Sequence, residues 1–246
     1  MACANNRGVR IHYELEGKGA PLVLQHGFTD SIQSWYDLGY VDGLSHRHQL
    51  ILVDARGHGA SDKPHETTAY GAEHHVADIV AVLDDLEIQR AHFFGYSMGG
   101  FIGFAMAKHA PNRINSLIIG GAIGASRQRD GSLFLQALER GAEAIPTLWG
   151  APLPSPLRAR LLANDVEALK ACVTDRPSFA DILSTMVMPC LMYAGEADDI
   201  YPAVRSVVAR MPNATFFSLP DLGHAESFLR SDLVLPHIIK FLDKSP

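Results

Sequence analysis

Ala91-His92-Phe93-Phe94-Gly95-Tyr96-Ser97-Met98-Gly99-Gly100 carries the clearest structural signal in the chain. A short apolar run ends here in a Gly-x-Ser-x-Gly motif, and a segment of helical character follows at once. Glycines two positions before and two after Ser97 remove the side chains that would collide across a sharp turn. We therefore expect a strained backbone at Ser97, with its hydroxyl pointing outward at the start of a helix. This pattern also arises by chance, so the interpretation depends on the rest of the sequence.

Apolar runs bounded by turn residues alternate with helical patterns along most of the chain. Strands that are apolar throughout belong to parallel sheets covered on both faces. Strands alternating with helices predict a doubly wound, mostly parallel α/β sheet. The predicted strands are Pro21–Gln25, Leu50–Val53, Ala91–Gly95, Ile114–Ile119, Cys190–Ala194 and Ala214–Leu219, and the predicted helices are Gly71–Leu86, Met98–His109, Ala203–Met211 and Ser231–Leu242.

Two segments depart from this alternation of apolar strands and helices. Residues Val9–Leu15 alternate apolar and polar side chains, which predicts an exposed antiparallel edge strand after a turn at Asn6–Gly8. Residues 125–188 hold no convincing strand, and helical pieces are predicted at Ser132–Ala144 and Val166–Ala171. We interpret 125–188 as a small, mainly helical lid over the carboxyl edge of the sheet. The α/β core would then comprise residues 1–124 and 189–246.

Composition narrows the classes of function. The chain has 246 residues, of which 47% are hydrophobic and 20% charged, as is ordinary for a globular enzyme. Its net charge is −6 and its Lys and Arg residues form no cluster, which argues against nucleic-acid binding. Neither a signal peptide nor a run of 18 apolar residues is found, so we expect a cytoplasmic protein without a membrane span. Three distant cysteines fit neither a disulfide framework nor a metal site.

A serine nucleophile needs a base and an acid that orients the base. His224 follows the last predicted strand, directly after Gly223, and so belongs at the same sheet edge as Ser97. The acid is expected after the preceding strand, where Asp198 stands three residues after Gly195 and Asp199 is the adjacent alternative. The predicted triad is Ser97, Asp198 and His224. The order serine, acid, histidine along the chain is the one found with this serine motif.

Two backbone amides are expected to bind the negative charge that develops on the substrate oxygen. One is the N–H of Met98, directly after the nucleophile. The other is the N–H of Phe28 in the loop Gln25-His26-Gly27-Phe28, where Gly27 lets the backbone approach closely.

Metal and cofactor motifs are incomplete. His65-Glu66 would begin a zinc-protease motif, but position 69 is Ala. Adjacent His74 and His75 point to different faces of a helix. The glycine-rich run 120–124 lacks the Lys-Ser/Thr of a phosphate loop. We predict no metal and no cofactor, and we assign the polar loop 54–62 a structural role beside the site.

Together these motifs resemble the α/β-hydrolase superfamily, in particular the group of small serine esterases, enol-lactonases and cofactor-free haloperoxidases (perhydrolases). The resemblance covers nearly the whole chain outside the lid. It implies a Ser-His-Asp triad, an acyl-enzyme, and water as the second nucleophile. It does not imply a substrate, because the lid sets that choice. The motifs that carry it are Gln25-His26-Gly27-Phe28, Asp54-x-Arg56-Gly57-His58-Gly59-x-Ser61-Asp62-x-Pro64, Gly95-x-Ser97-Met98-Gly99-Gly100, Gly195-x-x-Asp198 and Gly223-His224.

The leading hypothesis is a hydrolase of small, largely apolar carboxylic esters or lactones. A carbon–carbon bond hydrolase of a ring-fission product and an enol-lactone hydrolase remain alternatives with the same triad, and a ligand receptor on this fold is less favoured. Dehalogenases and epoxide hydrolases of the superfamily use an Asp nucleophile, whereas position 97 is Ser. The sequence does not indicate an oligomeric state or a partner beyond the small-molecule substrate. The lid residues predicted to contact substrate are Phe134, Leu138, Leu148, Trp149 and Phe179.

Overall fold

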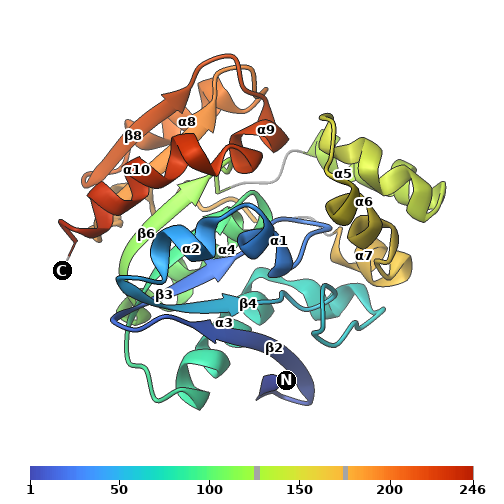
Figure 1. Cartoon of the computed structure of the whole chain (residues 1–246), viewed down its shortest axis with the longest axis horizontal. Coiled ribbons are helices and arrows are strands. Elements are labelled where there is room, and N and C mark those ends of the chain that lie inside the picture. The colour runs from blue at the N-terminus through green and yellow to red at the C-terminus, as the bar shows by residue number, and fades with distance from the viewer. Residues whose placement is uncertain (125–127, 174–176, 246) are drawn as a thin grey trace.

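The computed structural model describes residues 1–124, 128–173 and 177–245, without the side chains of residues 128–132. The described residues form one eight-stranded sheet of order β1-β2-β4-β3-β5-β6-β7-β8 (Figure 1). From β4 to β8 along this order every pairing is parallel, as the sequence predicts. The strands are β1 Ala2–Asn6, β2 Val9–Glu16, β3 Ala20–Gln25, β4 His48–Val53, β5 Ala91–Tyr96, β6 Ile114–Gly120, β7 Cys190–Gly195 and β8 Ala214–Leu219.

The N-terminus corrects one expectation. β2 is antiparallel, as predicted, but it is not at the edge, because β1 pairs with it on the outer side. Arg7 and Gly8 have φ values of 53° and 92° and form the tight turn that joins the two strands. β1 was not predicted, because its five residues are small and include no β-branched or aromatic side chain. His12 in β2 is buried rather than exposed, because the loop 54–62 packs on it: its Nδ1 lies 2.9 Å from Asp54 Oδ2 and its backbone N–H donates to Ser61 Oγ at 2.9 Å.

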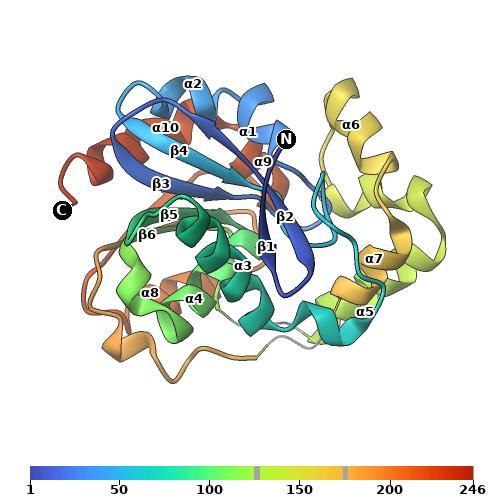
Figure 2. The same cartoon turned by 90° about the horizontal axis from the view of Figure 1, so that it is seen from below.

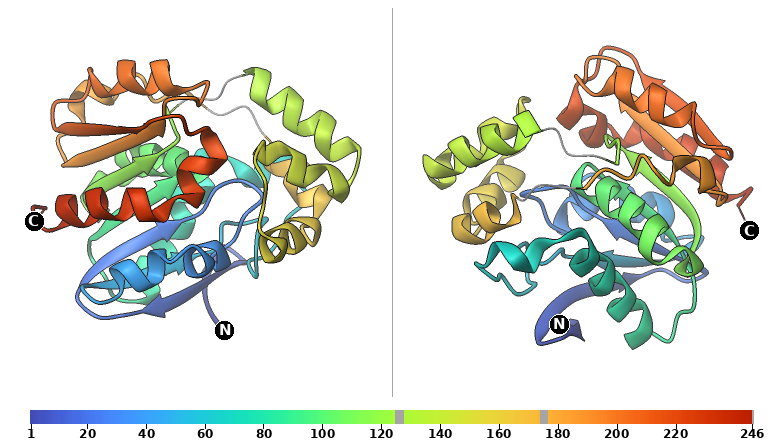
Figure 3. Two further views of the ribbon diagram at one scale, coloured as in Figure 1. Left: turned by 45° about the horizontal axis from the view of Figure 1, so that its top comes forward. Right: turned by 180° about the vertical axis from the view of Figure 1, so that it is seen from behind.

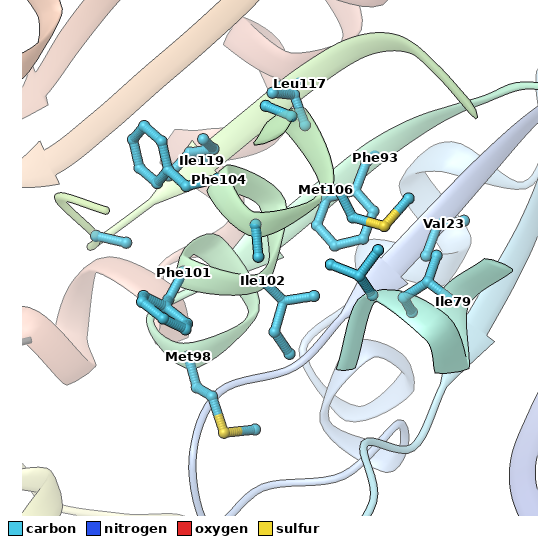
Figure 4. Packing of buried hydrophobic residues seen from close by; sticks show 14 of the residues in the cluster. Val23, Ile79, Phe93, Met98, Phe101, Ile102, Phe104, Met106, Leu117 and Ile119 are labelled. Atoms are coloured by element: carbon cyan, nitrogen blue, oxygen red, sulfur yellow. The ribbon is translucent and has the colours of Figure 1, made fainter. Parts of the chain in front are cut away.

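Helices cover both faces of the sheet, as expected for a doubly wound fold (Figure 2). Side chains alternate between the two faces along each strand. Val23 in β3 packs against the helices on one face, which we call the first layer, and Leu22 and Leu24 pack against those on the other face, the second layer. Figure 4 shows the first layer, in which α4 packs against Phe93 and Ile119. The first layer contains α3 Ala72–Asp85, α4 Met98–His109 and α8 Tyr201–Val208, and the second contains α1 Gln33–Asp37, α2 Tyr40–Leu44, α9 His224–Leu229 and α10 Ser231–Leu242.

The predicted core helices agree with these bounds except at two places. α8 begins two residues earlier than predicted, because Pro202 is favourable in a first helical turn, where its missing N–H is not needed, and it ends at Val208, three residues before the predicted end. α9 was not predicted, since six residues are too few to establish a helical period. Short 3-10 turns complete the connections: η1 Thr67–Tyr70, η2 Pro111–Arg113 and η4 Leu183–Thr185.

A group of helices lies apart from the sheet at one end of the molecule (Figure 3). We call residues 128–173 the α5–α7 segment; no strand occurs within it. The predicted start of the lid at residue 125 lies outside the described residues. Gly141, with φ 92°, separates α5 from η3, so the predicted helix Ser132–Ala144 ends earlier than expected. The segment consists of α5 Gln128–Glu139, η3 Ala142–Trp149, α6 Ser155–Leu162 and α7 Val166–Cys172.

The α5–α7 segment has a small apolar cluster of its own. The chain before the segment and the chain after it are also joined, because Phe179 N–H donates to the carbonyl of Gly124 at 2.8 Å. The cluster also contacts Phe28 after β3 and Leu229 at the end of α9. Its buried members are Leu138, Ile145, Leu157, Leu161 and Leu169. Across the described ranges, every helix is too short or too polar to traverse a membrane.

Candidate active site

The turn between β5 and α4 has the strain that the motif predicts. Ser97 has φ 52° and ψ −111°, which a non-glycine residue rarely adopts and which costs on the order of 1–3 kcal/mol. A Cβ on Gly95 would lie 2.1 Å from the carbonyl oxygen of Gly99, and a Cβ on Gly99 would lie 2.0 Å from that of Gln25. Both glycines are therefore required by backbone contacts rather than by flexibility. They allow β3, the turn and α4 to approach closely around Ser97.

Ser97, His224 and Asp198 lie in hydrogen-bonding contact. Ser97 Oγ is 2.9 Å from His224 Nε2, and His224 Nδ1 is 2.6 Å from Asp198 Oδ2. Because a carboxylate only accepts, Nδ1 carries the proton and Nε2 is free to accept the hydroxyl proton of Ser97. The Asp198 side chain is 5% exposed, whereas that of His224 is 42% exposed. The buried anion can thus stabilise an imidazolium whose other edge remains accessible.

The loop after β7 distinguishes Asp198 from its neighbour. Asp198 Oδ1 accepts the amide hydrogen of Ile200 at 3.1 Å, which leaves Oδ2 for His224. The Asp198 N–H donates to the carbonyl of Gly195 at 3.2 Å, and a Cβ on Gly195 would meet the carbonyl of Leu222 at 2.0 Å. Asp199 is exposed. The structure therefore brings Asp198, the acid preferred from the sequence, to the histidine.

Residues that the sequence analysis did not single out hold His224. Glu226 Oε2 accepts the N–H of Gly223 at 2.7 Å, and the hydroxyl of Tyr96 donates to the carbonyl of His224. A Cβ on Gly121 would lie 3.0 Å from His224 Cε1, so a glycine is needed behind the ring. The Glu226 contact has a sequence signal, since an acid three residues after a helix N-cap closes a capping box. Tyr96 has none, because only the fold places it against the last loop.

The loop after β3 passes over Ser97. A Cβ on Gly27 would lie 3.4 Å from Ser97 Cβ. The carbonyl of Gly27 accepts two hydrogen bonds, from His26 Nδ1 at 2.8 Å and from the N–H of Asp30 at 3.3 Å. In a trans peptide the N–H points opposite to its carbonyl, so these two donors set the direction of the Phe28 N–H. Met98, first in α4, has an N–H without an intrahelical acceptor.

Two buried neutral histidines support this loop. His26 Nε2 accepts the N–H of Ala55 at 3.0 Å, so Nδ1 holds the proton that goes to Gly27. His58 Nε2 accepts the N–H of Thr29 at 3.1 Å. Burial lowers the pKa of His58 to about 3, so its imidazole stays neutral and able to accept at physiological pH. The loop 54–62 thus supports the site without touching Ser97, in agreement with its predicted structural role.

The five residues predicted to contact substrate fall into different environments. The half-buried ring of Phe134 is 5.3 Å from that of Phe28, and half-buried Trp149 donates to Thr29 Oγ1 at 3.1 Å. Both therefore border the loop beside Ser97. Leu148 is half-buried in η3. Leu138 and Phe179 are fully buried, the first within the α5–α7 cluster and the second against α4, so they serve packing.

The histidines and acids outside the triad form no metal centre in the part of the chain that the structure describes. No group of three His, Cys, Asp or Glu side chains is arranged there to hold an ion. His65, the start of the incomplete zinc motif, pairs with Asp165 at the beginning of α7 at 3.1 Å.

Comparison with known proteins agrees with the fold. The sequence matches the model of the α/β-hydrolase fold family over residues 20–165. The chain belongs to the α/β-hydrolase family. The resemblance inferred from the motifs is thereby confirmed.

Three proteins similar to this α/β-hydrolase have different activities in their names. It is 29% identical over 246 residues to a putative 2-succinyl-6-hydroxy-2,4-cyclohexadiene-1-carboxylate synthase of Bacillus subtilis strain 168, covering 88% of this chain and 89% of the relative. It is 29% identical over 263 residues to a 2-hydroxy-6-oxononadienedioate/2-hydroxy-6-oxononatrienedioate hydrolase of Burkholderia vietnamiensis strain G4, covering 95% and 91%. The solved enol-lactonase from Burkholderia xenovorans LB400 superposes with a TM-score of 0.87 at 22% identity, covering 99% of this chain and 100% of that one. At that identity the superposition shows a shared fold.

Proposed function

We propose that this α/β-hydrolase is a serine esterase that cleaves small, largely apolar carboxylic esters or lactones through an acyl-enzyme. The observation that carries the proposal is the continuous relay from Ser97 Oγ through His224 to Asp198, with contacts of 2.9 and 2.6 Å. Such a relay activates a hydroxyl that is otherwise a weak nucleophile.

In the first half-reaction Ser97 Oγ attacks the substrate carbonyl while its proton passes to His224 Nε2. Asp198 stabilises the resulting imidazolium through its hydrogen bond to Nδ1. The N–H groups of Phe28 and Met98 bind the oxyanion of the tetrahedral intermediate. As the intermediate collapses, the proton on Nε2 goes to the leaving alcohol, and Ser97 remains acylated. In a lactone the released hydroxyl stays attached to the acyl group.

In the second half-reaction water attacks the acyl carbonyl and gives its proton to His224 Nε2. The same two amides bind the second oxyanion. Collapse releases the carboxylic acid, and the proton on Nε2 returns to Ser97 Oγ. The net change is the addition of one water across the ester bond, so neither a redox partner nor a cofactor is needed.

The side chains near the oxyanion loop support the preference for apolar substrates. Phe28 of the loop and its neighbours Phe134 and Trp149 are half-buried aromatic residues. The nearby cation Arg160 is occupied by Asp37 at 2.6 Å and by Ser34 at 3.2 Å. We propose residues 125–188 as a lid over Ser97, with Phe134, Leu148 and Trp149 as the substrate-contacting candidates.

The proposal is tested with p-nitrophenyl esters of two to eight acyl carbons and with a panel of lactones. Ser97→Ala should remove essentially all turnover, whereas Ser206→Ala, at an exposed position on α8, should leave it unchanged. Full turnover by the Ser97→Ala variant would refute the mechanism.

A second candidate is hydrolysis of a carbon–carbon bond in a vinylogous diketone by the same residues. It is favoured by the extent of the similarity to the 2-hydroxy-6-oxononadienedioate hydrolase, which spans 95% of this chain. Turnover of such a ring-fission product far above that of every ester and lactone would favour this candidate over the first.

A further inference from the structure

Thr29, directly after the proposed oxyanion donor Phe28, has an unfavourable backbone conformation. Its φ is 68°, a left-handed value that is strained for a β-branched residue. Thr29 is nevertheless only 2% exposed and lies in the loop that passes over Ser97. A strained residue of this kind persists only where its surroundings hold it.

Three side chains hold Thr29, and two of them come from the α5–α7 segment. From the sheet side, His58 Nε2 accepts the N–H of Thr29 at 3.1 Å. From the segment, Asn164 Nδ2 donates to the carbonyl of Thr29 at 2.8 Å. Trp149 Nε1 donates to Thr29 Oγ1 at 3.1 Å. The N–H, the carbonyl and the hydroxyl of this one residue are therefore all engaged.

We propose that Trp149 and Asn164 are positioning residues that keep the Phe28 N–H directed at the substrate oxyanion. The α5–α7 segment would then complete the oxyanion site through Thr29, in addition to covering it. This inference rests on the proposed function, because the direction of the Phe28 N–H matters only if an oxyanion forms at Ser97.

The path from Thr29 to the Phe28 N–H is short and consists of backbone. The peptide after Thr29 supplies the N–H of Asp30, which donates to the carbonyl of Gly27 at 3.3 Å. That carbonyl belongs to the same peptide as the Phe28 N–H and fixes its direction. If Thr29 relaxes to negative φ, the Asp30 N–H rotates away and the peptide loses one of its two supports. His26 alone would then hold it.

The two contacts differ in how cleanly they can be tested. Asn164 Nδ2 also lies 3.1 Å from the carbonyl of Leu161, so its replacement frays the end of α6 as well. Trp149→Phe keeps an aromatic ring in place and removes the N–H donor. Thr29→Val keeps the β-branched shape and removes the acceptor. These two substitutions address the same hydrogen bond from its two ends.

The experiment is a double-mutant cycle of Trp149→Phe and Thr29→Val, measured with the best p-nitrophenyl ester. Each single variant should lower kcat about tenfold with KM within about twofold, because a misdirected donor weakens transition-state binding more than ground-state binding. The double variant should be no slower than the slower single variant. His65→Ala is the matched control, since it removes the exposed contact to Asp165 of the segment without touching Thr29, and its kcat should equal that of wild type.

Labelling of Ser97 by an arylsulfonyl fluoride gives a readout independent of the natural substrate. Ser97 Oγ attacks the sulfur, its proton goes to His224 and fluoride leaves, while charge develops on a sulfonyl oxygen. The labelling rate, followed by mass spectrometry, should fall about tenfold in the Trp149→Phe variant. Labelling of wild type without turnover of any ester would refute the proposed substrate class and leave the inference to be judged by the labelling rates.

Three results would overturn the inference. One is a Trp149→Phe variant with wild-type kcat and labelling rate. Another is strictly additive losses in the double-mutant cycle. The third is an equal loss in the His65→Ala control, which would mean that docking of the segment in general is responsible. If wild type is neither labelled nor active, the proposed function and the inference fail together.

Discussion

Replacing Gly99 with alanine tests whether backbone contact around Ser97 determines both stability and activity. The added Cβ would lie 2.0 Å from the carbonyl oxygen of Gln25, whereas real Cβ atoms essentially never come closer than 3.0 Å. The backbone must therefore separate by at least about 1 Å. Gln25 cannot move freely, because it is paired with Val53 on one side and Gly95 on the other in the centre of the sheet.

Gly103→Ala is the matched control, one turn further along α4. Its Cβ would lie 3.2 Å from Cε1 of Phe93, a side-chain atom that can shift by a few tenths of an ångström. In the interior of α4, Gly103→Ala gains about 1 kcal/mol of helix propensity, a gain that does not apply in full to Gly99 in the first turn. We expect Gly103→Ala to change the free energy of unfolding by less than about 1 kcal/mol. Gly99→Ala should cost about 3 kcal/mol, at the upper end of overpacking costs, because the obstacle is backbone.

Activity should respond more strongly than stability. A 1 Å displacement of Ser97 relative to the loop at Gly27 is expected to lower kcat about 100-fold, because nucleophile and oxyanion donor lose their alignment. Urea unfolding followed by circular dichroism measures the first effect, and p-nitrophenyl ester turnover measures the second. A Gly99→Ala variant as stable and active as wild type, or a Gly103→Ala variant that loses as much, would refute the reasoning.

Two further predictions concern the relay and the buried histidines. Asp198→Asn should lower kcat about 10³- to 10⁴-fold in steady-state kinetics, because a neutral amide no longer fixes the imidazole tautomer. Asp199→Asn, at the exposed neighbouring position, should leave kcat unchanged. Equal losses of kcat in the two variants would contradict the assignment of Asp198 as the acid. Burial lowers the pKa of His58 to about 3 and that of His92 to about 4, so below about pH 6.5 the unfolded chain binds more protons than the folded one. The free energy of unfolding should therefore fall on acidification from pH 6.5 towards pH 4, by up to about 1.4 kcal/mol per pH unit for each histidine, in urea titrations at fixed ionic strength. His92→Asn should make this slope shallower, and an unchanged slope would exclude His92 as a source.

Most of the fold could be predicted because its signals are local. Apolar runs such as Ile114–Gly120 and the helical period of Ala72–Asp85 depend on neighbouring residues alone, and their predicted bounds agree with the structure to within two residues. The strain at Ser97 was also predictable, since two glycines flanking a serine act through local sterics. β1 and α9 were not predictable in this way, because each has too few residues to show a period.

The candidate site likewise has a part that local sequence predicts and a part that depends on long-range contacts. The residue types and their order, with Ser97, then Asp198, then His224, follow from motifs placed after successive strands. The contacts that give these residues their geometry join segments far apart in the chain. Tyr96 reaches the carbonyl of His224 across 128 positions, and Trp149 reaches Thr29 across 120.

The sequence alone therefore determined which chemical groups stand at the carboxyl edge of the sheet, because local sterics and hydrophobic periodicity act over a few residues. What required the folded molecule is how the α5–α7 segment meets that edge. Leu138 and Phe179 resemble Phe134 and Trp149 in sequence as apolar lid residues, yet the first two are buried in packing and the second two border the loop at Phe28. Such a difference arises from long-range packing, which no short pattern encodes.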